Sequence, residues 1–189
     1  MPQRLAPEWH IAHWFNTPQP IALADLRGRV VLAVAFQMLC PGCVSHGLPQ
    51  ASRAREIFPE SDLAVIGLHT VFEHHAAQGS PAALTAFLHE YRIGFPVGLD
   101  TTGASRDLPE TMRVYGMQGT PTTLLIDRAG RLRLHQFGHL DDLRLGAAIA
   151  TLIGESPRAV DTAAPAAAAG QAHCDDDGCR VPAGAAVNR

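Results

Sequence analysis

The chain has 189 residues, of which 47% are hydrophobic and 17% are charged, and its formal net charge is −3. This composition suits a globular domain, and the charge and the lack of any basic run argue against nucleic acid as a partner. The longest apolar run, residues 30–36, is too short to span a membrane, so we expect no membrane association.

The first half of the chain predicts alternating strands and helices. Residues 30–36 are rich in valine and predict a buried strand that ends at a cysteine-containing turn. Residues 43–58 follow with apolar side chains near helical spacing, and residues 63–70 predict a second buried strand. The segment 80–91 opens with Ser and then Pro, which is typical of a helix start.

The second half predicts a hairpin followed by a helix. Residues 95–100 indicate a short strand, and residues 108–117 indicate a helical turn that stops at Gly116. Residues 122–138 read as two strands joined by a turn, and residues 140–154 predict an amphipathic helix. A strand–helix–strand unit followed by a hairpin and a helix predicts an α/β sandwich with a mixed sheet.

The composition changes after Gly154. Residues 155–189 are rich in alanine and proline and lack periodicity, so we expect a globular domain over residues 1–154 and a flexible, disordered tail beyond it. The tail carries a second cysteine pair, Cys174 and Cys179.

The first cysteine pair, Cys40 and Cys43, lies between a predicted strand and a predicted helix. This position makes Cys40 the helix N-cap and Pro41 the first helical residue, where its missing N–H is not needed. The amides of Gly42 and Cys43 then donate to the sulfur of Cys40, and the helix dipole favours its ionised form. Cys43, one turn on, is placed to resolve a mixed disulfide. Two buried, unreactive cysteines are the alternative interpretation.

Four stretches carry a family resemblance: "LADLRGRVVLAVAFQMLCPGC", "VIGLHTVFEHH", "FPVGLD" and "YGMQGTPTTLLIDRAGRL". Together they resemble the TlpA/ResA-like and AhpC/TSA-related redoxins, over about residues 5–153. The resemblance implies a thioredoxin-like three-layer α/β/α sandwich with an N-terminal extension. It also implies thiol–disulfide exchange at the Cys40/Cys43 pair.

The same resemblance implies a cis-proline at Pro121, preceded by Thr120. In this fold the backbone at that position pairs with an extended substrate segment, as an added strand does. Thr120 and Pro121 are therefore the predicted substrate-binding residues. Without the family, residues 119–121 indicate only a turn.

Several positions depart from the family pattern. The tryptophan before the first cysteine is replaced by Leu39, and the buried carboxylate of thioredoxins falls on Val34. His46, one turn after Cys43, and Glu73 are candidate acid–base residues, with a solvated surface position as the alternative. Pro49 lies one residue further from the second cysteine than thioredoxin's helix-kinking proline, which leaves the helix direction beyond Gly47 open.

Other features have competing interpretations. His69, His74 and His75 cluster at the end of the second predicted strand, and we expect a polar loop there rather than a metal site. Cys174 and Cys179 form a second redox pair in one hypothesis, which passes electrons between the core pair and a partner. A metal site that also uses His173, or no role, are the alternatives. Trp9 and Trp14 are expected to anchor the N-terminal segment.

The sequence thus predicts a cytoplasmic thiol–disulfide oxidoreductase without a bound cofactor or metal. Its partners would be protein or small-molecule disulfides and an external reductant, such as a thioredoxin or glutathione system. A thiol peroxidase that uses Cys40 is an alternative, although Gln37 and Ala33 replace the residues that orient peroxide in peroxiredoxins. A non-enzymatic metal-binding protein is a third reading.

Overall fold

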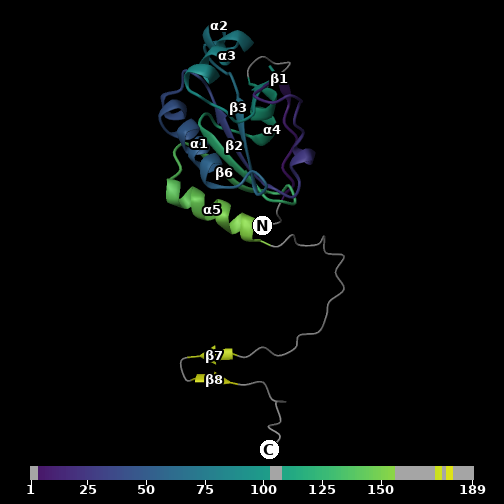
Figure 1. Cartoon of the computed structure of the whole chain (residues 1–189), viewed down its shortest axis with the longest axis vertical. Coiled ribbons are helices and arrows are strands. Elements are labelled where there is room, and N and C mark those ends of the chain that lie inside the picture. The colour runs from purple at the N-terminus through teal and green to yellow at the C-terminus, as the bar shows by residue number, and fades with distance from the viewer. Residues whose placement is uncertain (1–3, 103–107, 156–172, 176–177, 181–189) are drawn as a thin grey trace, which may run out of the picture. The chain divides into compact units, whose positions relative to one another are not determined.

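The structure is a computed structural model that describes residues 4–102, 108–155, 173–175 and 178–180. The chain divides into two units, residues 1–157 and 158–189. The first unit is built on a six-stranded sheet with helices on both faces (Figure 1). Among the described residues, no helix is both long enough and apolar enough to cross a membrane.

The sheet of the first unit has the strand order β1-β4-β3-β2-β5-β6. The three central strands, β4, β3 and β2, are parallel, and each remaining strand is antiparallel to its neighbours. The strands are β1 (Ile11–Phe15), β2 (Val30–Phe36), β3 (Leu63–His69), β4 (Val97–Asp100), β5 (Thr122–Ile126) and β6 (Leu132–Phe137).

The helices of this unit differ in type as well as length. A short 3₁₀ helix, η1, precedes β2, and a π-helical segment, η2, follows the cysteine pair. They are η1 (Leu23–Leu26), η2 (Cys43–Gly47), α1 (Leu48–Ile57), α2 (His75–Gln78), α3 (Pro81–Glu90), α4 (Glu110–Tyr115) and α5 (Asp142–Gly154).

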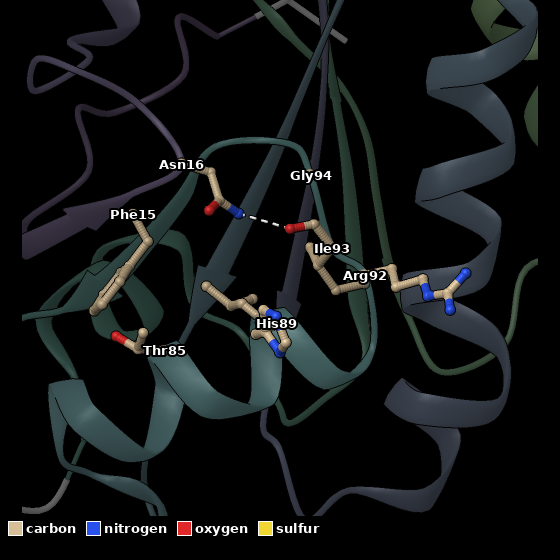
Figure 2. Close-up of a pocket in the computed structure, with 8 residues that line it drawn as sticks. Phe15, Asn16, Thr85, His89, Arg92, Ile93 and Gly94 are labelled. Carbon is tan, nitrogen blue, oxygen red and sulfur yellow. Dashed lines mark hydrogen bonds between the residues drawn. The ribbon is translucent and has the colours of Figure 1, made fainter.

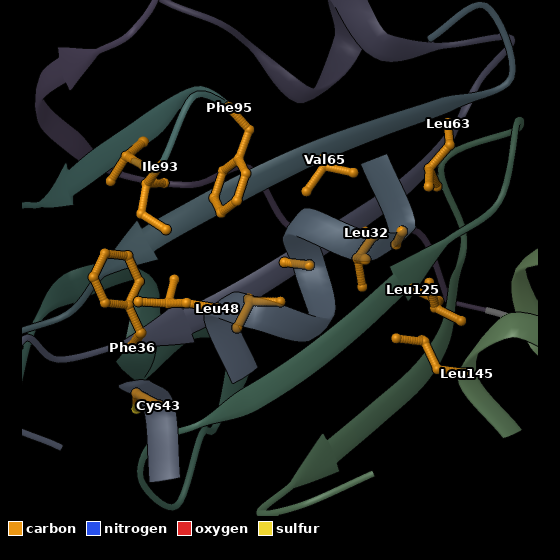
Figure 3. Close-up of a cluster of buried hydrophobic side chains, with 14 of the residues drawn as sticks. Leu32, Phe36, Cys43, Leu48, Leu63, Val65, Ile93, Phe95, Leu125 and Leu145 are labelled. Carbon is orange, nitrogen blue, oxygen red and sulfur yellow. The ribbon is translucent and has the colours of Figure 1, made fainter. Parts of the chain in front are cut away.

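The central strand β2 is buried on both faces, because its side chains alternate between two apolar clusters. Leu32 and Phe36 belong to the cluster that α1, α3 and α5 cover, and Figure 3 shows Cys43 within that cluster. Val31 and Ala33 point to the other cluster, which includes Met112 of α4. This arrangement is the predicted three-layer sandwich with a mixed sheet.

Local signals that the sequence carries are used as expected at the helix ends. The Ser80 side chain accepts a hydrogen bond from the Ala83 N–H at 3.1 Å, and Pro81 is the first residue of α3. Gly116 ends α4 in the left-handed conformation, with a φ of 64°. The sequence did not predict β1, which pairs with β4 at the sheet edge and contains Trp14.

The second unit contains a two-stranded antiparallel sheet of β7 (His173–Asp175) and β8 (Gly178–Arg180). This hairpin was not predicted for the tail. Its register places Cys174 opposite Cys179. The remaining tail residues, and so most of the predicted flexible segment, lie outside the described residues.

Candidate active site

The two core cysteines lie where the chain leaves β2 and begins a helix. The helical run starts at Pro41, directly after Cys40. The Cys43 N–H donates to the Cys40 sulfur at 3.2 Å, which is one of the two capping contacts expected from the sequence; the described hydrogen bonds do not include the other, from the Gly42 N–H. Cys40 is partly exposed and Cys43 is fully buried, so a solvent-borne reactant reaches Cys40 first.

Burial also determines the protonation of Cys43. Its removal from water raises the pKa of the Cys43 thiol to about 12, and a hydrogen bond with the Cys40 side chain adds to the rise. Hydrogen bonds from the Gln37 backbone and the Thr120 side chain act in the opposite direction and are smaller. Cys43 therefore holds its proton at neutral pH while the dithiol is reduced.

The loop before β5 faces the cysteine pair. The Thr120–Pro121 peptide bond is cis, and the Thr120 carbonyl lies 3.5 Å from the Cys40 sulfur, which donates to it. Pro121 packs on the helix at Gly47, where an added Cβ atom would lie 3.1 Å from the Pro121 Cβ. Glycine at position 47 thus allows this close approach of the loop to the helix. The structure brings Thr120 and Pro121 together with both cysteines.

The helix after the cysteines contains one π turn, over Cys43–Gly47. The Leu48 N–H donates to the Cys43 carbonyl, five residues back, so this turn holds one residue more than an α turn. The π turn therefore accommodates the one additional residue that separates Cys43 from Pro49, compared with the spacing in thioredoxin. The helical run from Pro41 to Ile57 therefore continues without a break, which answers the open question of its direction.

The two candidate acid–base residues lie in different surroundings. His46 is exposed, its Nδ1 lies 2.7 Å from the Ser45 hydroxyl, and its ring packs edge-on against His139 at 4.9 Å. No hydrogen bond among the described residues joins His46 to Cys43. Glu73 is also exposed, but its Oε1 accepts from the Gln37 side chain at 3.3 Å, which connects it to the turn before Cys40.

Two buried glutamines beside the cysteines were not predicted. Gln37 and Gln78 are 1% and 0% exposed, and their side-chain amides hydrogen-bond each other at 3.0 Å. The Gln78 oxygen also accepts from the Leu39 N–H at 3.1 Å. A polar residue that continues a fully apolar strand, as Gln37 does, is the one signal that could have drawn attention to it.

The expected polar loop of histidines is wrong for one of its three members. His69 is the last residue of β3, is completely buried, and packs against the Phe36 ring at a centroid distance of 5.1 Å. His74 and His75 are exposed at the start of α2. Within the described residues, no group of three or more His, Cys, Asp or Glu side chains is arranged to hold a metal ion.

One groove of the described residues is separate from the cysteines. It has a volume of about 600 Å³ and is lined by residues near the end of β1 and the end of α3, including Phe15, His89 and Arg92 (Figure 2). The Asn16 side chain donates to the Ile93 carbonyl at 2.7 Å and fixes the loop at this groove. Neither cysteine nor Thr120 lines it, so the groove is not part of the candidate active site.

A central mixed sheet with a cysteine pair at the start of a helix is the arrangement of thioredoxin-like proteins. The chain belongs to the AhpC/TSA family, whose model matches residues 2–135.

Solved structures agree with this fold. The thioredoxin-like superfamily protein SPOA0173 is 58% identical, with a TM-score of 0.78, and the match covers 80% of this chain and 97% of that one. A thiol-disulfide isomerase from Corynebacterium glutamicum is 44% identical, with a TM-score of 0.76, over 80% of this chain and 98% of that one.

A curated relative is more distant. The thiol-disulfide oxidoreductase ResA of Bacillus thuringiensis subsp. konkukian is 26% identical over 112 residues, which are 59% of this chain. The chain spans 57% of the length of that relative.

Proposed function

We propose that this protein is a thiol–disulfide oxidoreductase in which Cys40 attacks and Cys43 resolves. The observation that carries the proposal is the contact between them: the sulfur of the partly exposed Cys40 accepts the N–H of the buried Cys43 at 3.2 Å. The family, and the names of the C. glutamicum and ResA relatives, support the same chemistry.

The proposed reaction has two exchange steps. The Cys40 thiolate attacks one sulfur of a substrate disulfide, whose S–S bond breaks and whose second sulfur leaves as a thiolate. Cys43 then gives up its proton, attacks the Cys40 sulfur and releases the first substrate sulfur. The substrate gains two electrons and the protein gains a Cys40–Cys43 disulfide, which an external dithiol must reduce. The high pKa of Cys43 keeps this thiol unreactive until the mixed disulfide has formed.

In this proposal the Thr120–Pro121 loop binds the substrate and positions its disulfide. The Thr120 carbonyl already lies 3.5 Å from the attacking sulfur, so a segment that pairs with this backbone would bring its own disulfide to Cys40. His46 and Glu73 stay predictions as the base that accepts the proton of Cys43.

Trapping tests the assignment of the two cysteines. Cys43→Ser, incubated with oxidised glutathione, should accumulate a glutathione adduct on Cys40 that is found by peptide mass, because the resolving thiol is gone. Cys40→Ser is the matched control, and its remaining core cysteine, Cys43, should form no adduct in the same time. An adduct-free Cys43→Ser protein, or a wild-type protein that fails to reduce insulin with dithiothreitol, would overturn the proposal.

Peroxide separates this function from the peroxidase alternative. At the position where peroxiredoxins place a hydroxyl, Gln37 is buried and its amide is bonded to Phe72, Glu73 and Gln78, so it offers no hydroxyl to peroxide. We therefore expect the protein to reduce insulin disulfides faster than it consumes peroxide, when peroxide consumption is measured stoichiometrically. Peroxide turnover with no insulin reduction would favour the alternative.

We further propose that Cys174 and Cys179 form a second dithiol that relays electrons. Their opposed register in the hairpin supports a disulfide between them. Cys174→Ser with Cys179→Ser in the full chain should slow turnover with a protein reductant, and unchanged turnover with every reductant would remove the relay. Metal analysis of protein purified without a chelator tests the competing metal site.

The partners and the location are proposed on the same basis. Protein or small-molecule disulfides are the proposed substrates, and a thioredoxin or glutathione system in the cytoplasm is the proposed source of electrons. The printed names of the relatives support disulfide substrates. Cell fractionation tests the location, and reduction assays with each purified system test the electron source.

A further inference from the structure

The turn before Cys40 is tied to a segment far along the chain. Residues 37–39 lead from β2 to Cys40, and residues 72–78 follow β3 and include α2. Five hydrogen bonds made by the side chains of Gln37 and Gln78 join these two segments or fix the second one. Both side chains are almost completely removed from water.

Each amide atom of the two glutamines has a partner. The Gln37 oxygen accepts from the Phe72 N–H at 3.2 Å and from the Gln78 amide at 3.0 Å, and its nitrogen donates to the Glu73 carboxylate at 3.3 Å. The Gln78 nitrogen also donates to the Glu73 carbonyl at 2.9 Å, and its oxygen accepts from the Leu39 N–H at 3.1 Å. Because each amide nitrogen meets an acceptor and each amide oxygen meets a donor, neither amide can turn over without breaking bonds.

The bonded segment is connected to the cysteine pair at Gln37 and at Leu39. The Gln37 carbonyl accepts the Cys40 N–H at 3.2 Å, and the Gln37 backbone forms the hydrogen bond that opposes the pKa rise of Cys43. Leu39, which the Gln78 oxygen holds, directly precedes Cys40. The position of the turn therefore decides where the Cys40 sulfur lies relative to the Cys43 N–H.

We propose that Gln78 and Gln37 are positioning residues for the cysteine pair. They fix the 37–39 turn against residues 72–78, and so hold the Cys40 sulfur against the Cys43 N–H and keep Cys43 covered. This deepens the proposed oxidoreductase function and rests on it where exchange is concerned. Neither glutamine touches the substrate sulfurs in this proposal.

The test replaces Gln78 with a residue of similar length that cannot hydrogen-bond. Gln78→Met should narrow the ratio of Cys40 to Cys43 alkylation rates by iodoacetamide in the reduced protein, by about threefold or more, because Cys43 is no longer held covered. The equilibrium constant of the Cys40–Cys43 disulfide with glutathione should shift by about threefold or more as well.

Gln50 provides the matched control. It is a buried glutamine, 7% exposed, whose amide donates to the Leu140 carbonyl at 2.7 Å and to Asp142 at 2.6 Å, and neither partner belongs to the 37–39 turn or to residues 72–78. Gln50→Met should lower the melting temperature as Gln78→Met does but leave the alkylation ratio unchanged. Equal alkylation ratios in both variants and the wild type would show that Gln78 is merely structural and would overturn the proposal.

Glu73 keeps the proposal testable if Gln78→Met does not fold. Glu73 is exposed, and both Glu73→Ala and Glu73→Gln remove its charge, but only the second keeps an oxygen for Gln37. The alkylation ratio should change in Glu73→Ala and recover in Glu73→Gln, and equal ratios in the two would contradict the network. Alkylation needs no disulfide exchange. A wild-type protein that does not exchange with glutathione would therefore refute the proposed function alone.

Discussion

The carboxyl ends of β2 and β3 lie side by side, and each carries a buried polar side chain, Gln37 after β2 and His69 at the end of β3. The two side chains differ in whether they have hydrogen-bond partners. Phe36 and His69 are partners in the parallel ladder, and Gln37 follows Phe36 directly. Every amide atom of Gln37 has a hydrogen-bond partner, whereas neither ring nitrogen of His69 has one among the described residues.

This comparison shows that partners, rather than burial, decide what a polar group does. A buried amide with all its bonds made fixes the chain around it, while a buried group without partners lowers stability by its lost hydration. For His69 the loss also lowers its pKa from 6.5 to about 4, because burial disfavours the charged ring. We expect Gln37 to stabilise the fold and His69 to weaken it, most strongly in acid.

The largest expected effect is the loss of stability in acid. The unfolded chain binds a proton at His69 near pH 6.5 and the folded protein only near pH 4, so unfolding takes up a proton between these values. Protonation of His69 does not change the free energy of unfolding above pH 6.5, and by pH 4 it lowers that free energy by about 3 kcal/mol.

Urea denaturation of the reduced protein at pH 8, 6 and 4.5 measures this dependence. His69→Leu should lose less stability than the wild type over the same range, since the carboxylates titrate equally in both. Parallel curves for the two proteins would mean that His69 is protonated in the folded state or is not buried.

The second effect is the cost of breaking the glutamine network. Gln37→Met should lower the free energy of unfolding at pH 8 by about 2 kcal/mol, because the Phe72 N–H and the Gln78 amide lose a buried acceptor. Gln136→Met is the control: this glutamine is exposed on β6, so its replacement should change stability by less than about 0.5 kcal/mol. A Gln37→Met protein as stable as the wild type would contradict the network.

The sequence predicts the parts of this molecule that depend on neighbouring residues. The apolar run of β2, the Ser80–Pro81 helix start and the spacing of Cys40 and Cys43 are all local signals, and each is found where expected. The placement of Thr120 beside Cys40 needed the family resemblance, because the two residues lie 80 positions apart.

Other parts depend on contacts that no local pattern records. β1 has no regular alternation and forms because β4 offers its edge, so the segment was expected only to pack. The Gln37–Gln78 bond joins residues 41 positions apart, and α2, which carries Gln78, is a single short turn. His69 was grouped with two exposed histidines because it lies at the end of the predicted strand, a few residues before them, whereas it is the buried last residue of β3.

The smallest expected effect completes the contrast between the two buried residues. His69→Leu at pH 8 should keep the stability of the wild type or raise it by about 1 kcal/mol, because the variant removes two unpartnered nitrogens and keeps an apolar contact with Phe36. The same urea titrations measure this change in the free energy of unfolding. The Gln37→Met protein should show a change of the opposite sign. If His69→Leu instead loses about 2 kcal/mol or more, the cost of breaking a buried hydrogen bond, then His69 has a partner and the two strand ends do not differ.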